Sequence, residues 1–366
     1  MKRIGLFLIL LLWAANILTV ILLIATAYSP HLQPAEHPVL SCLGLAFPIF
    51  ALANGCFLVL WMLLRQWRNA LAPLAGCLLC YASLRTYCPV NLPTDPLPEG
   101  TLKLLSYNVM AFNGVKKGKD GNAILNYLAQ SEADILCLQE YATSSGKHRL
   151  SQADVDQALK AYPYHRIDAV GDRNARNRLA CYSKYPILSA RTLDYPSDYN
   201  GSVAYEVKVG EDTLLLINNH LESNKLTKED KGMYTDMLKS PEKEKVRHGA
   251  RLLVSKLAEA SLLRAPQADA IAHELRRSRL DGAIVCGDFN DTPISYTHHT
   301  VAENMDDAFV TSGCGLGISY NQNKFYFRID HILISKNLKA YNCTVDHTIK
   351  ESDHYPIWCH IGKKTP

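Results

Sequence analysis

The first 98 residues contain very few charged side chains. The basic ones are Lys2, Arg3, Arg65, Arg68 and Arg85, and the acidic ones are Glu36 and Asp95. Since the whole chain has 39 basic and 35 acidic residues, the remaining 34 and 33 lie within 99–366. That second part is almost neutral and lacks the basic surplus typical of tight nucleic-acid binding, although a local basic groove is still compatible with it.

The sequence also lacks a cysteine pattern that would indicate a disulfide framework or a zinc site. Cys77 and Cys80 have C-x-x-C spacing, but they lie in an apolar run without a second pair, which favours simple packing. Cys343 and Cys359 would be able to pair only if their strands are neighbours. We therefore expect the eleven cysteines to contribute little to the architecture.

Long apolar runs dominate residues 1–90. Ile4–Ala27 carries no charge and is long enough to cross a bilayer, which requires about 20 residues. A second run extends from about Val39 to Leu64, and a third, shorter one covers Leu71–Leu84. None has Asp, Glu or Lys at mid-depth, where an ion path would place them, so a transporter or channel is disfavoured. We expect residues 1–90 to be a membrane anchor with two to three transmembrane helices.

The charges that flank these runs predict the topology. Lys2/Arg3 and Arg65/Arg68 place the N-terminus and the second loop in the cytoplasm by the positive-inside rule. If the third run also crosses, the downstream domain is outside; if it only lies in the interface, that domain is cytoplasmic. We favour crossing.

Residues 91–100 are rich in proline and predict a stiff linker to a domain over 101–366. In this domain strand-like runs outnumber helical ones. Strands are expected at 102–109, 133–140, 179–183, 187–193, 203–209, 213–219, 283–286, 325–334, 340–347 and 356–361. Helices are expected at 122–130, 152–161, 246–277 and 295–303. Hairpins mixed with helical crossovers favour an α/β fold in which two packed sheets have helices outside.

Polar residues recur where the apolar strands end. They are Asn108, Glu140, His220, Asp288, Asn290, Asp330, Asp353 and His354. Each alone is compatible with a turn or a surface position, and Asp330 with a salt bridge to Arg328. Turn residues without a common purpose would not fall so regularly at strand ends, which is where ligands bind in α/β proteins.

Such a set of polar residues is suited to the hydrolysis of a phosphate ester. It needs a Lewis acid on the non-bridging oxygens, and Mg²⁺ prefers carboxylate and water ligands. Glu140 and Asp353 are the natural metal carboxylates, and Asn108 is a candidate third ligand. Attack by water also needs a base and stabilisation of the developing charge.

The remaining polar residues match those needs. A histidine held by an aspartate, here His354 with Asp330, is suited to proton transfer near neutrality. Asp288 would activate or orient the water. Asn290 and His220 would donate hydrogen bonds to the phosphoryl oxygens.

The motifs that contain these residues resemble the endonuclease/exonuclease/phosphatase (DNase I-like) superfamily. They are Ser-Tyr-Asn-Val (106–109), Leu-Gln-Glu (138–140), Asn-His-Leu (219–221), Gly-Asp-Phe-Asn (287–290), Arg-Ile-Asp-His-Ile-Leu (328–333) and Ser-Asp-His-Tyr-Pro (352–356). The resemblance covers about 101–362, with the motifs in the expected order. It implies a four-layer α/β sandwich and a Mg²⁺ or Mn²⁺ cofactor.

The resemblance also implies roles for individual residues. Glu140 would be a metal ligand, Asn108 would position metal or phosphate, and Asp353 would lie at the metal. His220 would contact the phosphate, as in the DNase I and sphingomyelinase branches. Asp288 and Asn290 would orient water and substrate, while Asp330 would orient the catalytic His354.

Together these features predict a membrane-anchored, Mg²⁺-dependent phosphoesterase that hydrolyses phosphodiester bonds in nucleic acid. The alternatives are a sphingomyelinase-like enzyme acting on phospholipid head groups, a small-molecule phosphodiesterase or phosphatase, and a non-catalytic membrane receptor for a phosphorylated ligand. The anchored architecture resembles bacterial members of the superfamily. We expect a multi-pass protein of the bacterial cytoplasmic membrane that contacts lipid through residues 4–90, has its catalytic domain on the exoplasmic side, and needs no obligate protein partner.

A few further polar residues are expected to be less important. Arg178 and Lys184 flank a strand and are expected in solvated positions. Arg264 and Gln267 share one helix face by spacing and either lean over the site or pair on the helix surface. The pair His298-His299 has no carboxylate or cysteine at ligand spacing and is expected on the surface.

Overall fold

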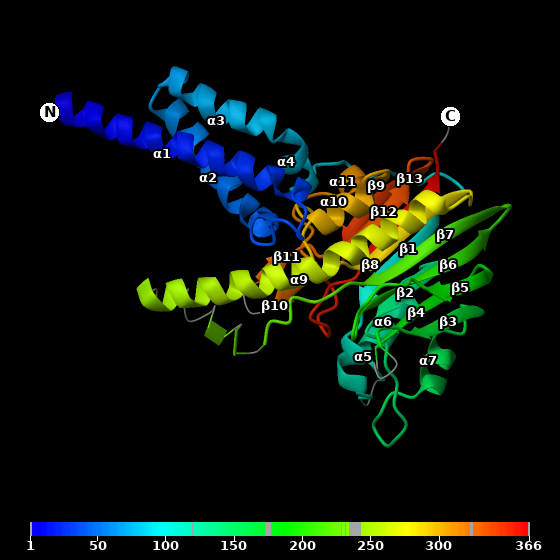
Figure 1. The fold of residues 1–366 in the computed structure, drawn as a ribbon. Coiled ribbons are helices and arrows are strands. Elements are labelled where there is room, and N and C mark those ends of the chain that lie inside the picture. Colours follow the sequence, from blue (N-terminus) through cyan, green and yellow to red (C-terminus); the bar gives the residue numbers. More distant parts are fainter. Residues whose placement is uncertain are drawn as a thin grey trace.

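The computed structural model describes residues 2–118, 121–172, 177–227, 229–230, 232–233, 243–322 and 325–364. The N-terminal helices lie together and project away from a body that contains both large sheets (Figure 1). The N-terminus lies at the far end of this projection.

The N-terminal part consists of helices joined by short turns. In chain order these are α1 (Lys2–Tyr28), η1 (Ser29–His31), η2 (Leu40–Ala46), α2 (Phe47–Leu63), α3 (Trp67–Leu79) and α4 (Tyr81–Tyr87). Among the described residues, Phe7–His31 and Leu40–Leu63 are long and apolar enough to cross a membrane, whereas α3 is not. Length and composition thus suggest membrane association.

Buried side-chain amides connect these apolar helices. The indole Nε1 of Trp61 donates to Asn16 Oδ1 at 2.9 Å, joining α2 to α1. Asn54 Nδ2 donates to the carbonyl oxygen of Pro73 at 2.9 Å, joining α2 to α3. Interhelical hydrogen bonds of this kind hold helices together where the surroundings are apolar and offer no competing water.

The body contains two six-stranded mixed sheets. The first has the order β13 (Leu338–Val345), β14 (Ile357–Lys363), β1 (Leu102–Asn108), β2 (Ile135–Gln139), β4 (Arg178–Ser183), β3 (Tyr164–Ala169). The second has the order β5 (Ile187–Thr192), β6 (Gly201–Val209), β7 (Asp212–His220), β8 (Gly282–Asp288), β12 (Asp330–Ser335), β9 (Met305–Asp307). The β1–β2 and β7–β8 pairs are parallel, so their carboxyl ends lie at the same edge of each sheet.

The two sheets pack face to face, with helices on their outer faces. Leu104 and Cys137 of the first sheet share a core with Leu216 and Cys286 of the second. The outer face of the first sheet buries Ile124 and other side chains of α6 (Ala123–Gln130) and α7 (Gln152–Ala158). The outer face of the second is covered by α9 (Lys243–Arg277) and α10 (Tyr296–Ala302). The predicted four-layer α/β sandwich is confirmed.

One predicted strand is wrong. The run 325–334 is not continuous: β11 (Phe325–Phe327) pairs with β10 (Tyr320–Gln322) in a separate ribbon, and β12 begins only at Asp330. The hydroxyl of Ser319 accepts hydrogen bonds from the backbone N–H groups of Ile329 and Asp330, both at 3.0 Å, where a neighbouring strand would otherwise accept them. The apolar pattern of 325–334 does not show that a serine hydroxyl replaces a neighbouring strand as the hydrogen-bond acceptor.

The N-terminal helices also pack on the sandwich. The hydroxyl oxygens of Ser41 and Ser261 lie 3.3 Å apart, and the rings of His31 and His299 meet edge to face. Gly44 lies so close to the carbonyl group of Ile294 that a Cβ there would collide with it. The loop between α1 and α2 is therefore seated on the sandwich.

The linker over 91–100 is held against the body as well. Asn91 Nδ2 donates to the carbonyl oxygens of Val310 and Gly313, and the Asn342 side chain bonds both the N–H and the carbonyl oxygen of Thr94. The expected stiffness thus comes from hydrogen bonds in addition to proline. Cys343 and Cys359 lie on neighbouring strands but are both free thiols.

Candidate active site

The parallel strands of the two sheets end at a common cleft of about 430 Å³. Glu140, His220, Asp288, Asn290, Asp353 and His354 line it. The other predicted site residues lie directly behind: Asn108 contacts Glu140 and Asp288, and Asp330 contacts His354. Every predicted site residue therefore belongs to one cluster.

Local backbone geometry positions the residues at the cleft. Glu140 and Asn290 both have a φ of 52°, in the left-handed region that is unfavourable for residues with a side chain. Gly287 has a φ of 129°, and a Cβ there would collide with the backbone of Asn219 on the neighbouring strand β7. These conformations turn the chain sharply after β2 and β8, and such strain is common where a site is fixed by its surroundings.

Asn108 connects the carboxylates of the two sheets. Its Nδ2 donates to Glu140 Oε1 and to Asp288 Oδ2, each at 3.2 Å. Its Oδ1 accepts from the backbone N–H of Met110 at 3.1 Å and so points away from these acids. The amide in this orientation holds the carboxylates in place.

His354 lies between two aspartates. Its Nδ1 is 2.8 Å from Asp330 Oδ2, and its Nε2 is 3.5 Å from Asp288 Oδ2. Burial alone would lower the pKa of His354, but the charges of Asp330 and Asp288 outweigh it and raise that pKa well above its ordinary value. This shift favours the protonated ring, in which Nδ1 donates to Asp330 and Nε2 faces Asp288. Arg328, the alternative partner considered for Asp330, instead donates to carbonyl oxygens of Thr86, Tyr87 and Leu316.

His220 faces the same acids as a neutral ring. Asn177 Nδ2 donates to its Nδ1 at 3.1 Å, which leaves the ring proton on Nε2. That nitrogen lies 3.7 Å from Glu140 Oε1 and 3.6 Å from Asp288 Oδ2. Burial lowers the pKa of His220. The ring thus presents an N–H donor to the cleft.

The carboxylates lack sufficient positive charge around them. Burial raises the pKa of Glu140, and the nearby Asp353 charge raises it further. Burial raises the pKa of Asp288 to about 6, against the opposing effect of the His354 charge. A divalent cation would supply the missing charge, and the oxygen donors Glu140 and Asp353 suit Mg²⁺.

A second arrangement fits a metal less well. Ligand atoms of Asp288, Asp330 and His354 also lie within 4.8 Å of one another. His354 already uses Nδ1 for Asp330, however, and the aspartate charges raise its pKa and so favour the protonated ring, whereas a metal ligand must be a neutral imidazole. Glu140, which is about one-third exposed at its side chain, is the more accessible ligand.

Several residues that surround the site were not identified from the sequence. Asn177 fixes the tautomer of His220, and the Tyr320 ring meets the His354 ring edge to face at 5.1 Å. Asn219 is buried with no hydrogen-bond partner for either side-chain atom. Asn219 lies near the end of β7, which is the signal that identified Asn108 at the end of β1. Asn177, which precedes β4, and Tyr320 have no such signal.

The polar residues that were expected to be less important occupy different positions in the structure. Arg264 lines the cleft, and its Nη1 donates to the Glu222 carbonyl oxygen at 2.9 Å. Gln267 is buried outside the cleft lining, and its Oε1 accepts from the Glu222 N–H at 2.9 Å. Arg178 is exposed, as expected. Lys184 forms an ion pair of 3.0 Å with Asp134.

The expected surface position of His298 is wrong. This residue is buried, its Nε2 lies 2.9 Å from Asp307 Oδ2, and its ring is 4.7 Å from that of His331. The partner comes from β9 and lies nine positions further along, beyond helical ligand spacing, so a search at such spacing could not find it. His299 is the exposed member of the pair and contacts His31.

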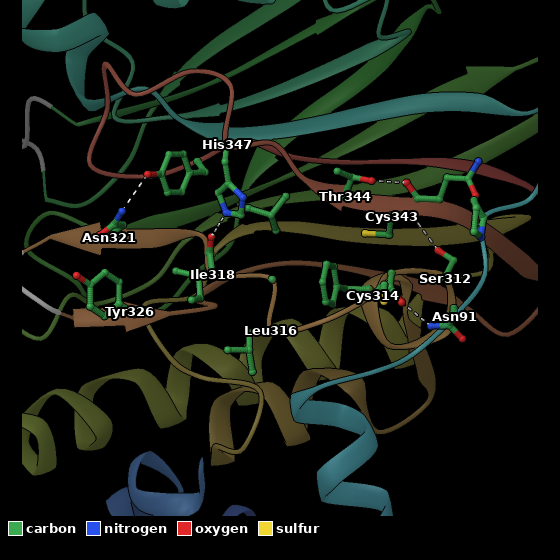
Figure 2. A pocket seen from close by; sticks show the side chains of 17 residues that line it. Asn91, Ser312, Cys314, Leu316, Ile318, Asn321, Tyr326, Cys343, Thr344 and His347 are labelled. Atoms are coloured by element: carbon green, nitrogen blue, oxygen red, sulfur yellow. Dashed lines mark hydrogen bonds between the residues drawn. The ribbon is translucent and has the colours of Figure 1, made fainter. Parts of the chain in front are cut away.

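A larger groove of about 760 Å³ lies elsewhere on the body (Figure 2). Of the described residues that line it, none is acidic, and none is lysine or arginine. His347 is its one histidine, and that ring is hydrogen-bonded through Nε2 to the Ile318 carbonyl oxygen at 2.8 Å (Figure 2). This groove therefore lacks the groups that phosphoryl chemistry needs.

The chain is similar to solved structures, and the first of the two below agrees with the sandwich. An endonuclease/exonuclease/phosphatase from Beutenbergia cavernae aligns with a TM-score of 0.50 and 14% identity, over 72% of each chain. Humanized TDP2 from D. rerio aligns with a TM-score of 0.48 and 15% identity, over 72% of this chain and 100% of its own. At such identities the likeness shows the fold alone.

In the sequence comparisons, two separate segments of the chain match family models. No curated protein matches it. Residues 8–87 match a domain of unknown function, DUF8431. Residues 105–354, more than half of the chain, match the model of the Endonuclease/Exonuclease/phosphatase family. This match spans every residue of the cleft cluster, and the chain belongs to that family, whose fold and chemistry are those of metal-dependent phosphoesterases.

Proposed function

We propose that the protein is a membrane-anchored, Mg²⁺-dependent phosphoesterase that hydrolyses phosphodiester bonds. The observation that carries this proposal is the convergence of acids, amides and histidines from both sheets on one cleft, with His354 held between Asp330 and Asp288. In this proposal residues 1–90 form the anchor, 91–100 the linker and 101–366 the catalytic domain.

Glu140 and Asp353 are our candidates for holding Mg²⁺, or Mn²⁺ in its place. A bound cation of this type would polarise a phosphoryl oxygen and offset the charge that develops on it. Asn108 donates to Glu140 and so orients this ligand. The raised pKa of Glu140 agrees with a carboxylate whose natural counter-charge is a cation.

The remaining residues are assigned by their hydrogen bonds. In its protonated form His354 donates from Nε2 to a phosphoryl or leaving oxygen, and Asp330 positions its ring. Asp288 orients the attacking water and accepts its proton, while His220 donates from Nε2 to the phosphate. Asn290 Nδ2 is bonded to the Leu221 carbonyl oxygen at 2.9 Å, so we assign it mainly to shaping the turn after Asp288.

We further propose that the domain lies on the exoplasmic side of a bacterial cytoplasmic membrane. The loop between α1 and α2 contacts the sandwich through Ser41, so the basic ends at Lys2/Arg3 and Arg65/Arg68 lie at the opposite ends of these helices. α3 and α4, with 13 and 7 residues, would together span about 30 Å and return the chain to the sandwich. A C-terminal alkaline phosphatase fusion should be active in cells, and an inactive fusion of a well-expressed chain would contradict this orientation.

The phosphoesterase proposal is tested with the full chain in lipid nanodiscs and bis(p-nitrophenyl) phosphate. We expect hydrolysis with Mg²⁺, none with EDTA, and at least a 100-fold lower rate for Glu140→Gln. Mg²⁺ should also raise the Tm of the wild type but not of Glu140→Gln, because only a bound ligand stabilises the folded state. Hydrolysis that persists in EDTA or in Glu140→Gln would overturn the metal assignment. Mg²⁺ binding without turnover would indicate a non-catalytic receptor.

A further inference from the structure

One wall of the catalytic cleft comes from the N-terminal part of the chain. Ser41, Cys42, Leu45 and Ile49 line the same cleft as Glu140 and His354. All four belong to Leu40–Leu63, one of the segments apolar and long enough to cross a membrane. The cleft is therefore bounded on this side by the first turns of a candidate membrane helix.

A second wall, on α9, changes from apolar to polar toward the catalytic residues. Leu253, Leu257, Ser261 and Arg264 all line the cleft and follow one another at helical spacing on one face. Arg264 lies at the catalytic end, where its Nε is 3.2 Å from Asp291 Oδ2. Leu257 and Leu253 lie about two and three turns from Arg264. Both belong to the N-terminal half of α9, the half that projects beyond the sandwich in Figure 1.

Aromatic residues complete the apolar part of the cleft. Phe325 and Phe327 of β11 line it and are only partly buried. Ile49 is 65% exposed, although it is large and apolar. Partly exposed apolar side chains from α2, α9 and β11 thus surround a passage that leads to the acids, an arrangement suited to an apolar chain.

The cleft has few basic side chains available to bind a polyanion. Apart from histidines, the described residues that line it include only Lys225 and Arg264 as cations. Lys225 pairs with Glu222 at 2.9 Å, and Arg264 is bonded to Asp291 and Asn224. Nucleic acid binding depends on several basic contacts to successive phosphates, and the walls beyond the catalytic centre are apolar instead.

We propose that the substrate is a phosphodiester carried by a membrane amphiphile. Its phosphate lies at Glu140 and His354, and its apolar chain lies between the α2 wall, with Leu45 and Ile49, and the α9 wall, with Leu253 and Leu257. This inference rests on the proposed phosphoesterase function and adds the substrate class.

The test uses the full chain in nanodiscs and a series of alkyl p-nitrophenyl phosphodiesters, from methyl to octyl, below their micellar concentrations. All members share one scissile bond and one leaving group, so the series varies only the apolar chain. A fully buried methylene contributes about fourfold to binding. We expect kcat/KM to rise at least 10-fold from methyl to octyl, and plasmid DNA to be cleaved poorly at matched phosphate concentration.

Variants of the wall residues distinguish binding of the alkyl chain in the cleft from simple partition of the probe into lipid. Ile49→Gln should reduce the methyl-to-octyl ratio, and Ile49→Gln/Leu257→Gln should reduce it below threefold. Leu188→Gln, a matched control at a leucine that is 57% exposed on β5 outside the cleft, should retain the full ratio. Because Ile49 is largely exposed, its single variant is expected to fold normally.

The outcomes distinguish the two proposals. Hydrolysis of the methyl ester that requires Glu140, with no rise along the series, would support the phosphoesterase and overturn the amphiphile. A rise that survives in the double variant, or plasmid cleavage more efficient than octyl ester cleavage, would also overturn it. No hydrolysis of any member would overturn the proposed function and this inference together.

Discussion

Two Asp–His clusters lie on opposite faces of the same strand. Asp330 and His331 are neighbours on β12, and strand alternation sends one to the cleft and the other to the interior behind it. On the cleft side, His354 bonds Asp330 at 2.8 Å; on the other, His298 bonds Asp307 at 2.9 Å next to the His331 ring. The residue types and distances of the two clusters are nearly the same.

Their surroundings are different. In the cleft cluster, a further carboxylate, Asp288, faces the histidine, and the pKa of His354 is raised. In the second cluster, formed by His298, Asp307 and His331, Asp307 Oδ1 accepts from the N–H groups of Phe309 and Val310 and caps α11 (Ala308–Ser312). Burial lowers the pKa of His331 to about 3. Access to substrate and the local charge, more than the residue types, therefore distinguish a candidate catalytic cluster from a structural one.

The largest expected difference comes from removing one histidine of each cluster. His354→Ala should lower kcat/KM for bis(p-nitrophenyl) phosphate by about 10³-fold, because proton donation and charge stabilisation are lost together. His298→Ala should leave kcat/KM within about 10-fold and lower the Tm instead. Steady-state kinetics and thermal unfolding of both variants measure this. If folded His298→Ala were as inactive as His354→Ala, the distinction between the clusters would be wrong.

A smaller difference is expected for the aspartates. Asp330→Asn keeps the shape of the side chain but removes the charge that orients His354, so kcat should fall about 10- to 100-fold with little change in KM. Asp307→Asn should instead reduce the free energy of unfolding by about 1–2 kcal/mol, because it weakens the bonds to His298 and to the start of α11. Equal effects of the two variants on kcat would contradict this assignment.

An effect on stability alone is expected from the cluster of His298, Asp307 and His331, as a pH dependence. The folded pKa of His331, about 3, is below the unfolded value of about 6.5, so the unfolded state binds more protons between these values. Stability from the neutral ring is present above pH 6.5 and is lost as the pH falls, by about 1.4 kcal/mol per pH unit. His331→Gln should reduce the slope of unfolding free energy between pH 6 and 4. Denaturant titrations of both proteins measure it, and parallel slopes would show that the ring does not contribute.

Much of the sandwich was predictable because its strands are apolar and end in polar residues. The strands expected at 203–209 and 213–219 form the β6–β7 hairpin. The edge strand β3 was not identified, since most of its side chains are at least partly exposed and give no apolar pattern. The break before β12 was missed because it depends on Ser319, eleven positions upstream of Asp330.

The membership of the cleft cluster was predictable for a simpler reason. Parallel strands end at one sheet edge, so polar residues after β1, β2, β7 and β8 converge whatever the loops do. The contribution of the N-terminal segment was not predictable. Nothing in the sequence of Leu45 or Ile49 indicates that a segment so far from the acids would form part of their cleft. That contact arises only from the docking of the loop between α1 and α2.

Arg328 shows what this docking means for the chain as a whole. Its buried guanidinium donates to the last carbonyl groups of α4, at Thr86 and Tyr87, and to Leu316. A protein cut in the linker would keep this charge in its interior with most of its acceptors gone, which is costly. The first 90 residues are therefore expected to stabilise the sandwich in addition to serving as the proposed anchor, and the two halves should be studied together.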